Sequence, residues 1–375
     1  MPVVSWLRPA LLLVAVAMVV AACGGSPSPG PSPTPSGGPS SSGSSTATAS
    51  PSSSPSTSPS TSGSPTAAPA ACTGVRYAQV LGQAPAYGPG RLRHYPVDAF
   101  ACAAYWLAQS DDLFVPQSLA VDESAGVAYV GGYRWARTYG PRPCQIAVVD
   151  LATGAVRAFQ SKFWASIYHT APTYCRHGGG MQLVSSGDGA GLWVQETQRL
   201  WVLDPSALGG TPAAPVKRWW RMGAGLRGSA MVVQGDRVGV ASFSPRYRGR
   251  IYWFAMSDLL RSGVTDLTLG RASASAVRPV ASGRVPRLLQ GIAVGPGGLW
   301  YSTSGGGCAQ LIGPDGHRYD FVPGSEGLQF AGDSLYVTSE SGARPYIRGT
   351  SKKNVPVLVR LLTAKVLATS PSCRQ

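Results

Sequence analysis

The chain has 375 residues and carries 32 Lys and Arg against 17 Asp and Glu, so its formal net charge is +15 at neutral pH. All of the basic residues but Arg8 lie from Cys72 onward, together with every acidic residue, so the C-terminal part is strongly basic. GxSxG, HExxH and P-loop motifs are absent from the sequence. The sequence therefore offers no motif of the common serine hydrolases, zinc proteases or nucleotide-binding enzymes.

Residues 1–22 predict an export signal. Arg8 supplies a short positive region, and residues 10–22 form an apolar run of 13 residues. This run is too short for a helix that crosses a bilayer, which needs about 20 residues, but it has the length of a signal-peptide core.

The tetrad 20–23 (Val-Ala-Ala-Cys) resembles a bacterial lipobox. The resemblance implies cleavage before Cys23 and lipidation of this cysteine by acyl chains such as palmitate, which would anchor the protein at the extracytoplasmic face of the cell membrane. The alternative is an ordinary secretory signal with a chance cysteine.

Residues 23–71 predict a disordered tether after the lipidated Cys23. Residues 24–71 contain no charged or aromatic side chain and consist almost wholly of Ser, Pro, Thr, Gly and Ala. Such a segment cannot bury enough apolar surface to offset the entropy of ordering it. Proline-rich chains extend by about 3.1 Å per residue, so the tether could reach somewhat over ~100 Å from the membrane.

Residues 72–375 predict an all-β domain built from a repeated hairpin. Five segments share an apolar strand, a tight Gly/Asp turn and a second strand: 118–133, 181–197, 230–244, 291–304 and 327–340. Third and fourth strands follow most of them, and four antiparallel strands per repeat are typical of a β-propeller blade. We expect a β-propeller with six blades, or five or seven as alternatives, and residues 73–117 are the source of the sixth. Within them, 99–108 (AFACAAYWLA) predicts a strand or a short helix. The alternative fold is a β-sandwich with long loops.

The fourth repeat (291–316, GIAVGPGGLWYSTSGGGCAQLIGPDG) resembles blades of NHL, YncE and streptogramin-lyase propellers. The resemblance implies the fold far more than an activity, because its motifs encode strands and turns. Streptogramin lyases use a metal with a His acid/base, and propeller lactonases hold their metal with Asn and acidic side chains. This chain has four His, of which His169 and His177 lie in the long loops. It has the single Asn354, and Glu326 is the one acid at the aligned mouth position, so the lactonase metal site cannot be assembled by the family pattern. We therefore assign no catalytic residue, no metal and no cofactor.

The domain has an even number of cysteines, which predicts disulfides in an exported protein. The candidates are Cys72, Cys102, Cys144, Cys175, Cys308 and Cys373. No CxxC motif is present, which argues against a zinc ribbon or a thioredoxin-type site. Cys144 and Cys175 lie in neighbouring long loops and are expected to pair, whereas a bridge between Cys72 and Cys373 could close the ring. The connectivity stays open otherwise.

The longest connections of the repeats are expected on one face of the propeller, and they are rich in arginine and aromatic residues. They include 133–144, 160–180, 243–250, 270–290 and 341–354. The candidate anion-binding residues are Arg134, Arg137, Arg246, Arg248, Arg250, Arg344 and Arg348. A face of one charge attracts anions, and the arginine fork fits carboxylate and phosphate. The alternative is a solvated basic surface in an arginine-rich protein.

A second candidate site lies at the mouth of the central channel. Aligning the five repeats on their first strand places one residue just before each strand: Gln117, Gly180, Ser229, Gln290 and Glu326. Of these, Gln117, Ser229, Gln290 and Glu326 are polar and could bind a small ligand. The alternative is that they bind channel waters and one another.

The main hypothesis is a membrane-anchored binding lipoprotein whose basic face takes an anionic cell-wall polymer, a lipid head group or an acidic protein. Nucleic acid is not expected, because no motif for it is present and the compartment is extracytoplasmic. The alternative hypothesis is a diverged propeller lyase or hydrolase with its site at the channel mouth.

Overall fold

The computed structural model describes residues 72–88, 90–138, 142–166, 171–305, 308–347 and 354–372. The chain divides into two compact units, Met1–Pro65 and Thr66–Gln375, and every described residue belongs to the second. Several expectations therefore lie outside the described residues: the signal peptide (1–22), Cys23, the tether (23–71), Arg348 and Cys373. Among the described residues, no helix is long and apolar enough to cross a membrane.

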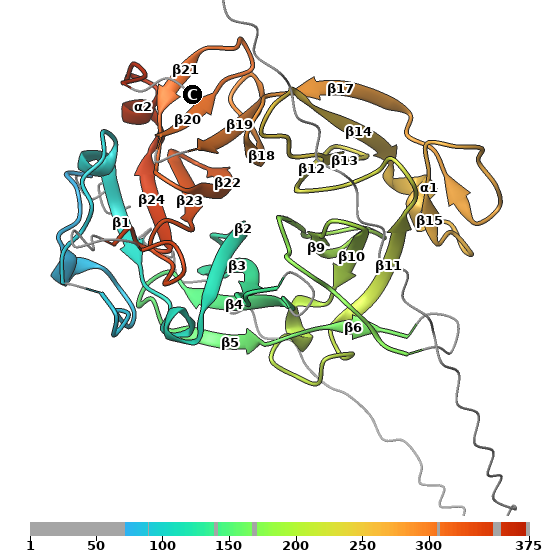
Figure 1. The fold of residues 1–375 in the computed structure, drawn as a ribbon, viewed down its shortest axis with the longest axis horizontal. Helices are drawn as coiled ribbons and strands as arrows, with labels where there is room; N and C mark the ends of the chain where they lie inside the picture. The colour runs from blue at the N-terminus through green and yellow to red at the C-terminus, as the bar shows by residue number, and fades with distance from the viewer. Residues whose placement is uncertain are drawn as a thin grey trace, which may run out of the picture. The chain divides into compact units, whose positions relative to one another are not determined.

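The described unit is all-β and has a propeller-like arrangement of sheets around a ring (Figure 1). The first sheet contains β2 (Phe114–Asp122), β3 (Val127–Arg134), β4 (Cys144–Asp150) and β5 (Val156–Gln160). The second contains β8 (Gly180–Val184), β9 (Gly191–Gln195), β10 (Arg199–Leu203), β11 (Val216–Met222), β15 (Asp266–Leu267) and β16 (Ala276–Val277). The third contains β12 (Ala230–Gln234), β13 (Arg237–Ala241), β14 (Gly249–Ala255) and β17 (Ala281–Val285).

Two further sheets complete the ring. The fourth contains β18 (Leu289–Gly295), β19 (Gly298–Gly305), β20 (Cys308–Ile312) and β21 (Arg318–Asp320). The fifth contains β22 (Ser325–Ala331), β23 (Ser334–Ser339), β24 (Leu358–Leu362) and β1 (Ala101–Tyr105). A separate hairpin pairs β6 (Trp164–Ala165) with β7 (Thr173–Tyr174). The helices are short: α1 (Met256–Leu260), α2 (Thr363–Val366), and the 3-10 turns η1 (Tyr77–Gln79), η2 (Asp98–Phe100), η3 (Ala108–Asp112) and η4 (Pro205–Ala207).

The first strands of the five sheets line the centre of the ring. β2 contacts β8, β8 contacts β12, β12 contacts β18, β18 contacts β22, and β22 contacts β2 again. The apolar faces of adjoining sheets pack against each other, as where Trp193 and Trp220 of the second sheet join Phe254 of the third in one buried cluster. Packing sheet against sheet around an axis covers apolar faces that a single four-stranded sheet would leave open.

The predicted hairpins are confirmed, and their turn chemistry explains them. In the third sheet Gln234 pairs with Arg237, which leaves Gly235 and Asp236 as a two-residue turn. Gly235 has φ of 57°, a conformation that glycine adopts without the steric penalty of a Cβ atom. The five repeats thus begin each sheet with the strand pair that the sequence predicted.

The N-terminal part of the domain does not build a sheet of its own. The segment 99–108 contributes β1, which pairs antiparallel with β24 as the outermost strand of the fifth sheet. The expectation of a sixth blade from residues 73–117 is therefore wrong: the described residues form four four-stranded sheets, one six-stranded sheet and the two-stranded β6–β7 hairpin. Backbone hydrogen bonds between β1 and β24, the first and last strands along the chain, close the ring.

The expected ring-closing bridge between Cys72 and Cys373 is also wrong, because Cys72 pairs with Cys102. Cys102 lies within β1, and the Cα atoms of the two cysteines are 4.2 Å apart, so this disulfide fastens the segment before β1 to β1 itself. The pair Cys144–Cys175 is confirmed. Cys308 is disulfide-bonded as well.

Strand direction sorts the connections onto two faces. Connections from a first to a second strand, and from a third to a fourth, lie on one face, here named the turn face. Connections from a second to a third strand, and from one sheet to the next, lie on the other, here named the loop face. Residues 270–280 were expected on the loop face, but they belong to the β14–β17 connection of the turn face, where β15 pairs with β11 of the neighbouring sheet.

Candidate functional site

Three connections carry the predicted anion-binding arginines to the loop face. Arg134 and Arg137 lie at the end of β3 and just after it, Arg246 and Arg248 between β13 and β14, and Arg344 between β23 and β24. Each connection joins the second strand of a sheet to the third, so all of them meet at the same face of the ring.

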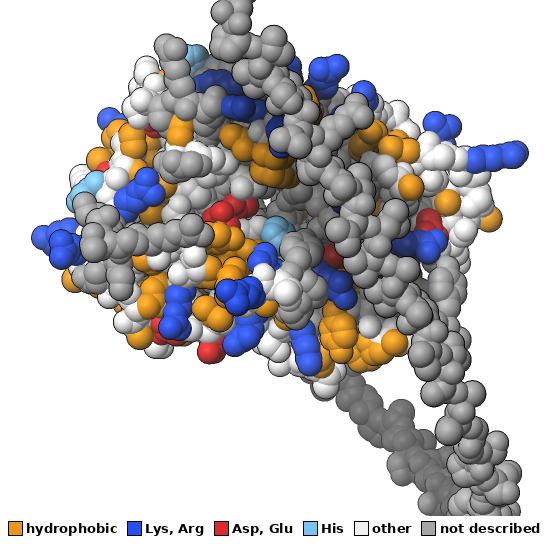
Figure 2. All heavy atoms as spheres, in the orientation of Figure 1, with side chains coloured by type: hydrophobic (Ala, Val, Ile, Leu, Met, Phe, Trp, Pro, Cys, Tyr) orange, Lys and Arg blue, Asp and Glu red, His pale blue; other side chains and the backbone are white. Residues whose placement is uncertain are grey.

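The arginines of this set have no acidic partner among the described residues. The set is Arg134, Arg137, Arg246, Arg248, Arg250 and Arg344, all of them exposed. Arg250 lies in β14 opposite Arg284 of β17, so two like charges are neighbours there. None of the six forms an ion pair with a described Asp or Glu. Figure 2 shows Lys and Arg side chains spread over one face of the ring, with acidic and His side chains near its middle.

The disulfide Cys144–Cys175 fixes two loop-face connections to each other. It joins the start of β4 to the crossing between β5 and β8, and both cysteines are buried. The backbone N–H of Cys144 also donates to the carbonyl oxygen of Cys175 at 3.0 Å. This buried disulfide therefore restrains the two loop-face connections next to the first sheet.

Three predicted channel-mouth residues sit at β-bulges of the innermost strands. The β2–β3 register shifts at Gln117, the β18–β19 register at Gln290, and the β22–β23 register at Glu326. A bulge adds a residue to one strand and redirects a side chain out of the normal alternation. The bulge thus explains why a polar residue recurs at this position of an otherwise apolar strand. The sequence alone did not show the bulge.

The remaining aligned positions have local structural roles. Gly180 is the first residue of β8, and a Cβ atom there would lie 2.5 Å from the backbone nitrogen of Met231, so the close approach of β8 and β12 requires glycine. Ser229 precedes β12, and its hydroxyl accepts a hydrogen bond from the backbone N–H of Phe243 at 3.2 Å. Among the described residues, no hydrogen bond links Ser229 or Gln290 to the other polar positions.

Gln117 and Glu326 belong to one cluster, which is completed by Glu340. The side-chain amide of Gln117 donates to Oε2 of Glu340 at 3.0 Å. Glu326 is only 3% exposed, and its Oε1 atom has no hydrogen-bond partner among the described residues. Burial raises the pKa of Glu326 well above its ordinary value, and the nearby Glu340 adds to this effect.

The second carboxyl of this pair titrates near neutrality. Burial raises the pKa of Glu340 to about 7, against the opposing effect of the hydrogen bond from Gln117. The negative charge of Glu340 is one cause of the raised pKa of Glu326, so ionisation of one carboxyl disfavours ionisation of the other. A carboxyl group of this kind can both donate and accept a proton.

A tyrosine pair and a histidine lie beside the carboxyl pair. The hydroxyl groups of Tyr133 and Tyr346 are hydrogen-bonded at 2.9 Å, and the Tyr133 ring stacks on His177 with centroids 4.7 Å apart. The Arg142 guanidinium lies 5.2 Å from the centroid of the Tyr133 ring. Burial lowers the pKa of His177 to about 4 and the positive charge of Arg142 adds to this shift, so the imidazole is neutral at physiological pH.

A pocket of about 410 Å³ opens on the loop face next to the second sheet. Its charged residues are Arg176, Glu196, Arg199 and Arg227.

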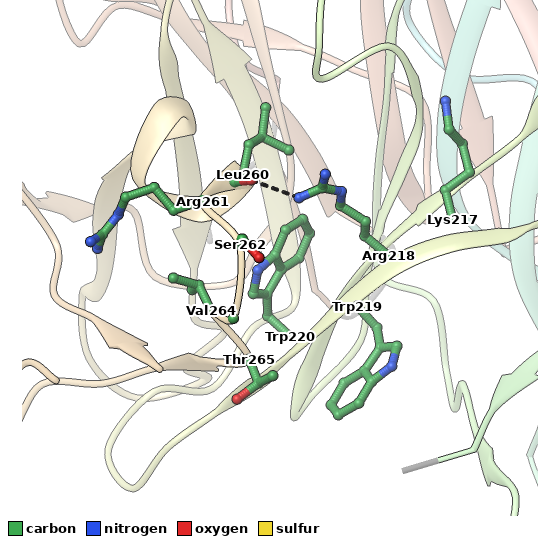
Figure 3. Close-up of a pocket in the computed structure, with 10 residues that line it drawn as sticks. Lys217, Arg218, Trp219, Trp220, Leu260, Arg261, Ser262, Val264 and Thr265 are labelled. Atoms are coloured by element: carbon green, nitrogen blue, oxygen red, sulfur yellow. Dashed lines mark hydrogen bonds between the residues drawn. The ribbon is translucent and has the colours of Figure 1, made fainter. Parts of the chain in front are cut away.

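Figure 3 shows a different groove of about 420 Å³, formed by the start of β11 and residues 260–265 near the turn face. There the Arg218 guanidinium donates to the carbonyl oxygen of Leu260 at 2.8 Å, and no predicted site residue lines the groove.

Sequence reasoning missed Glu196 and Glu340, although the repeat carries a signal for both. Each follows directly on the second strand of its sheet, Glu196 after β9 and Glu340 after β23. Alignment of the repeats on the first strand did not reveal this, whereas alignment on the end of the second strand would. Within the part of the chain that the structure describes, no three His, Cys, Asp or Glu side chains come together as metal ligands.

No protein-family model and no curated protein matches this sequence. The chain is similar in fold to the glutaminyl cyclase of Myxococcus xanthus, with 9% identity, a TM-score of 0.38, and 63% of this chain and 88% of that chain covered. It is also similar to the PQQ-bound aldose sugar dehydrogenase of Streptomyces coelicolor, with 14% identity, a TM-score of 0.31, and 67% and 82% covered. A putative oxidoreductase (glucose dehydrogenase) of Thermus thermophilus shows 14% identity, a TM-score of 0.35, and 65% and 82% covered. At these values the similarity says nothing about the activity of this chain.

Proposed function

We propose that the domain is a binding module, held at the extracytoplasmic face of the membrane by lipid on Cys23, whose loop face takes a polyanionic ligand of the cell envelope. One observation carries the proposal: six exposed arginines lie in or next to connections of a single face, and no described carboxylate is paired with any of them. The lipid anchor and the tether rest on the sequence of residues 1–71.

The chemistry of the arginines favours a polymer over a compact ligand. They come from three sheets, the first, the third and the fifth, so they are spread around the ring. A guanidinium group binds phosphate or carboxylate through two parallel N–H donors, and it is less strongly hydrated than an ammonium group. Repeated anionic groups along one chain can engage separated arginines at the same time, so that several weak contacts add up.

The β13–β14 connection offers the sharpest test. Replacing Arg246, Arg248 and Arg250 with Ser removes three exposed charges of the loop face, and we expect retention of the protein on isolated anionic cell-wall material to fall at least fivefold. Each exposed charge contributes up to about 1 kcal/mol, and three together suffice for this change. Retention is measured by co-sedimentation with the wall fraction.

A matched control removes the same charge from the turn face. Arg237, Arg261 and Arg278 are exposed in turn-face connections or at their ends. The first two are paired with Asp236 and Asp258, whose side chains are 85% and 45% exposed. Their replacement with Ser should leave retention unchanged. Equal losses in the two triple variants would mean that only net charge matters, and no loss in the Arg246, Arg248 and Arg250 variant would refute the proposal.

A further inference from the structure

The loop face contains a pocket of about 410 Å³ beside the second sheet. Three segments that are distant in sequence form it: the crossing from β5 to β8, the turn from β9 to β10, and the crossing from β11 to β12. The two crossings contribute Arg176 and Arg227, and Arg199 is the first residue of β10, directly after the turn. Its volume falls in the range of small-molecule sites, which is about 300–1,000 Å³.

The single acidic residue of the pocket is already engaged in its wall. Glu196 is 3% exposed, and its Oε1 accepts a hydrogen bond from Nη1 of Arg199 at 2.8 Å. Its Oε2 accepts from the backbone N–H of Arg176 at 3.2 Å. Glu196 therefore orients Arg199, and it neutralises one of the three arginines.

Three arginines against one glutamate leave the pocket with an excess of two positive charges. Arg176 and Arg227 are exposed and form no ion pair with a described carboxylate. In addition, the Nε atom of Arg199 is buried and has no hydrogen-bond partner among the described residues. A buried donor without an acceptor is costly, and an anion that enters the pocket could accept from it.

The uncharged part of the lining suits a hydroxylated ring. Thr173, Tyr174 and Gln198 supply hydroxyl and amide groups, which can exchange hydrogen bonds with hydroxyl groups of a ligand. Tyr174 belongs to the β6–β7 hairpin, where its ring packs at a tilt on Trp164 with centroids 6.5 Å apart. The partner ring holds Tyr174 in place beside the arginines.

We propose that this pocket binds one anionic sugar unit, a hydroxylated ring that bears a carboxylate or a phosphate group. Arg176, Arg199 and Arg227 take the anionic group, and Tyr174 and its polar neighbours take the ring. The inference rests on the proposed function, because it makes the pocket the place where the loop face recognises one unit of a polyanion.

The test is calorimetric titration of the full chain with glucuronic acid, glucose 6-phosphate, glucose and inorganic phosphate. We expect both anionic sugars to bind at least tenfold more tightly than glucose or inorganic phosphate. Replacing Arg176 and Arg227 with Ser should weaken the anionic sugars at least tenfold, and Tyr174→Ala should weaken them while leaving inorganic phosphate unchanged. The control variant, with Arg237 and Arg261 replaced by Ser, should bind like the parent chain.

Binding of neither anionic sugar, or equal binding by the Arg176 and Arg227 variant, would overturn the inference. Inorganic phosphate bound as tightly as glucose 6-phosphate would overturn its sugar part. If the anionic sugars fail to bind while the Arg246, Arg248 and Arg250 variant still loses wall retention, the inference fails alone. If they bind while that variant keeps full retention, the proposed function of the wider loop face fails instead.

Discussion

At the residue scale, burial decides the chemistry of the channel mouth. Gln117 and Glu326 were candidates from the sequence, because they recur at one position of the repeat. The sequence did not show that Glu340 would join them, since its contact with Gln117 spans 223 residues of chain. A carboxyl that donates, accepts and stays partly protonated differs from a solvated one only through its surroundings, and residue type alone does not reveal those surroundings.

The raised pKa of Glu340 predicts a pH-dependent stability. Its pKa is about 7 in the folded chain and near its ordinary value of 4.5 in the unfolded chain, so the folded state holds the proton more tightly. This contribution is fully present below pH 4.5 and is lost as the pH rises to about 7, at a cost of roughly 3 kcal/mol. We expect Glu340→Gln to flatten this decline in the free energy of unfolding, measured by urea denaturation from pH 4.5 to 8.

The control for this prediction is Asp188→Asn, an exposed carboxyl in the β8–β9 turn. It should keep the pH dependence of the parent chain. Glu326 remains in the Glu340 variant, so some decline will persist. A Glu340→Gln curve with the full parental slope would show that Glu340 is not the group that titrates.

At the element scale, turn chemistry and alternation determine the hairpins, but partner choice determines the sheet. β1 pairs with β24, although more than half of the chain lies between them. Its sequence, ACAAY, is a short apolar strand that many partners could accept. The choice follows from the open edge of β24, because an unpaired strand edge with buried apolar residues must be covered.

Removal of β1 should open the ring. A chain that starts at Trp106 leaves the edge of β24 unpaired, where Leu358, Val359 and Leu361 are fully buried in the intact domain. We expect a fall of the melting temperature by at least 10 °C and concentration-dependent association, measured by differential scanning calorimetry and analytical ultracentrifugation. The matched control starts at Cys72 and keeps β1. A chain without β1 that is monomeric and equally stable would contradict the role of this strand.

At the scale of the whole molecule, the net charge of +15 acts through its distribution. The same number of charges spread evenly would bind any polyanion weakly, whereas the connections of the loop face collect arginines from sheets that are far apart in sequence. Exposed charges are screened over about 10 Å at 0.1 M salt, so electrostatic binding weakens when salt is added.

The proposed binding should therefore depend steeply on ionic strength. Raising NaCl from 0.05 to 0.5 M should lower wall retention of the parent chain at least tenfold, and the variant without Arg246, Arg248 and Arg250 should show a shallower dependence because fewer counterions are displaced. Both are measured by the same co-sedimentation assay at several salt concentrations. Retention that is insensitive to salt would point to apolar contacts and contradict the electrostatic basis of the proposal.

The pairing of Cys144 with Cys175 was expected from their places in neighbouring long loops, and it is confirmed. The sequence by itself determined the hairpin repeat and the all-β class. These follow from local physics: side chains alternate with a period of two, and turns need glycine or aspartate at particular positions. Only the tertiary structure decided the number of sheets, the closure through β1, the pairing of Cys72 with Cys102, and the meeting of Arg176, Arg199 and Arg227 in one pocket. Each of these features depends on which surfaces, distant in the sequence, are buried against each other. The packing of the whole ring determines this, and neighbours along the chain do not.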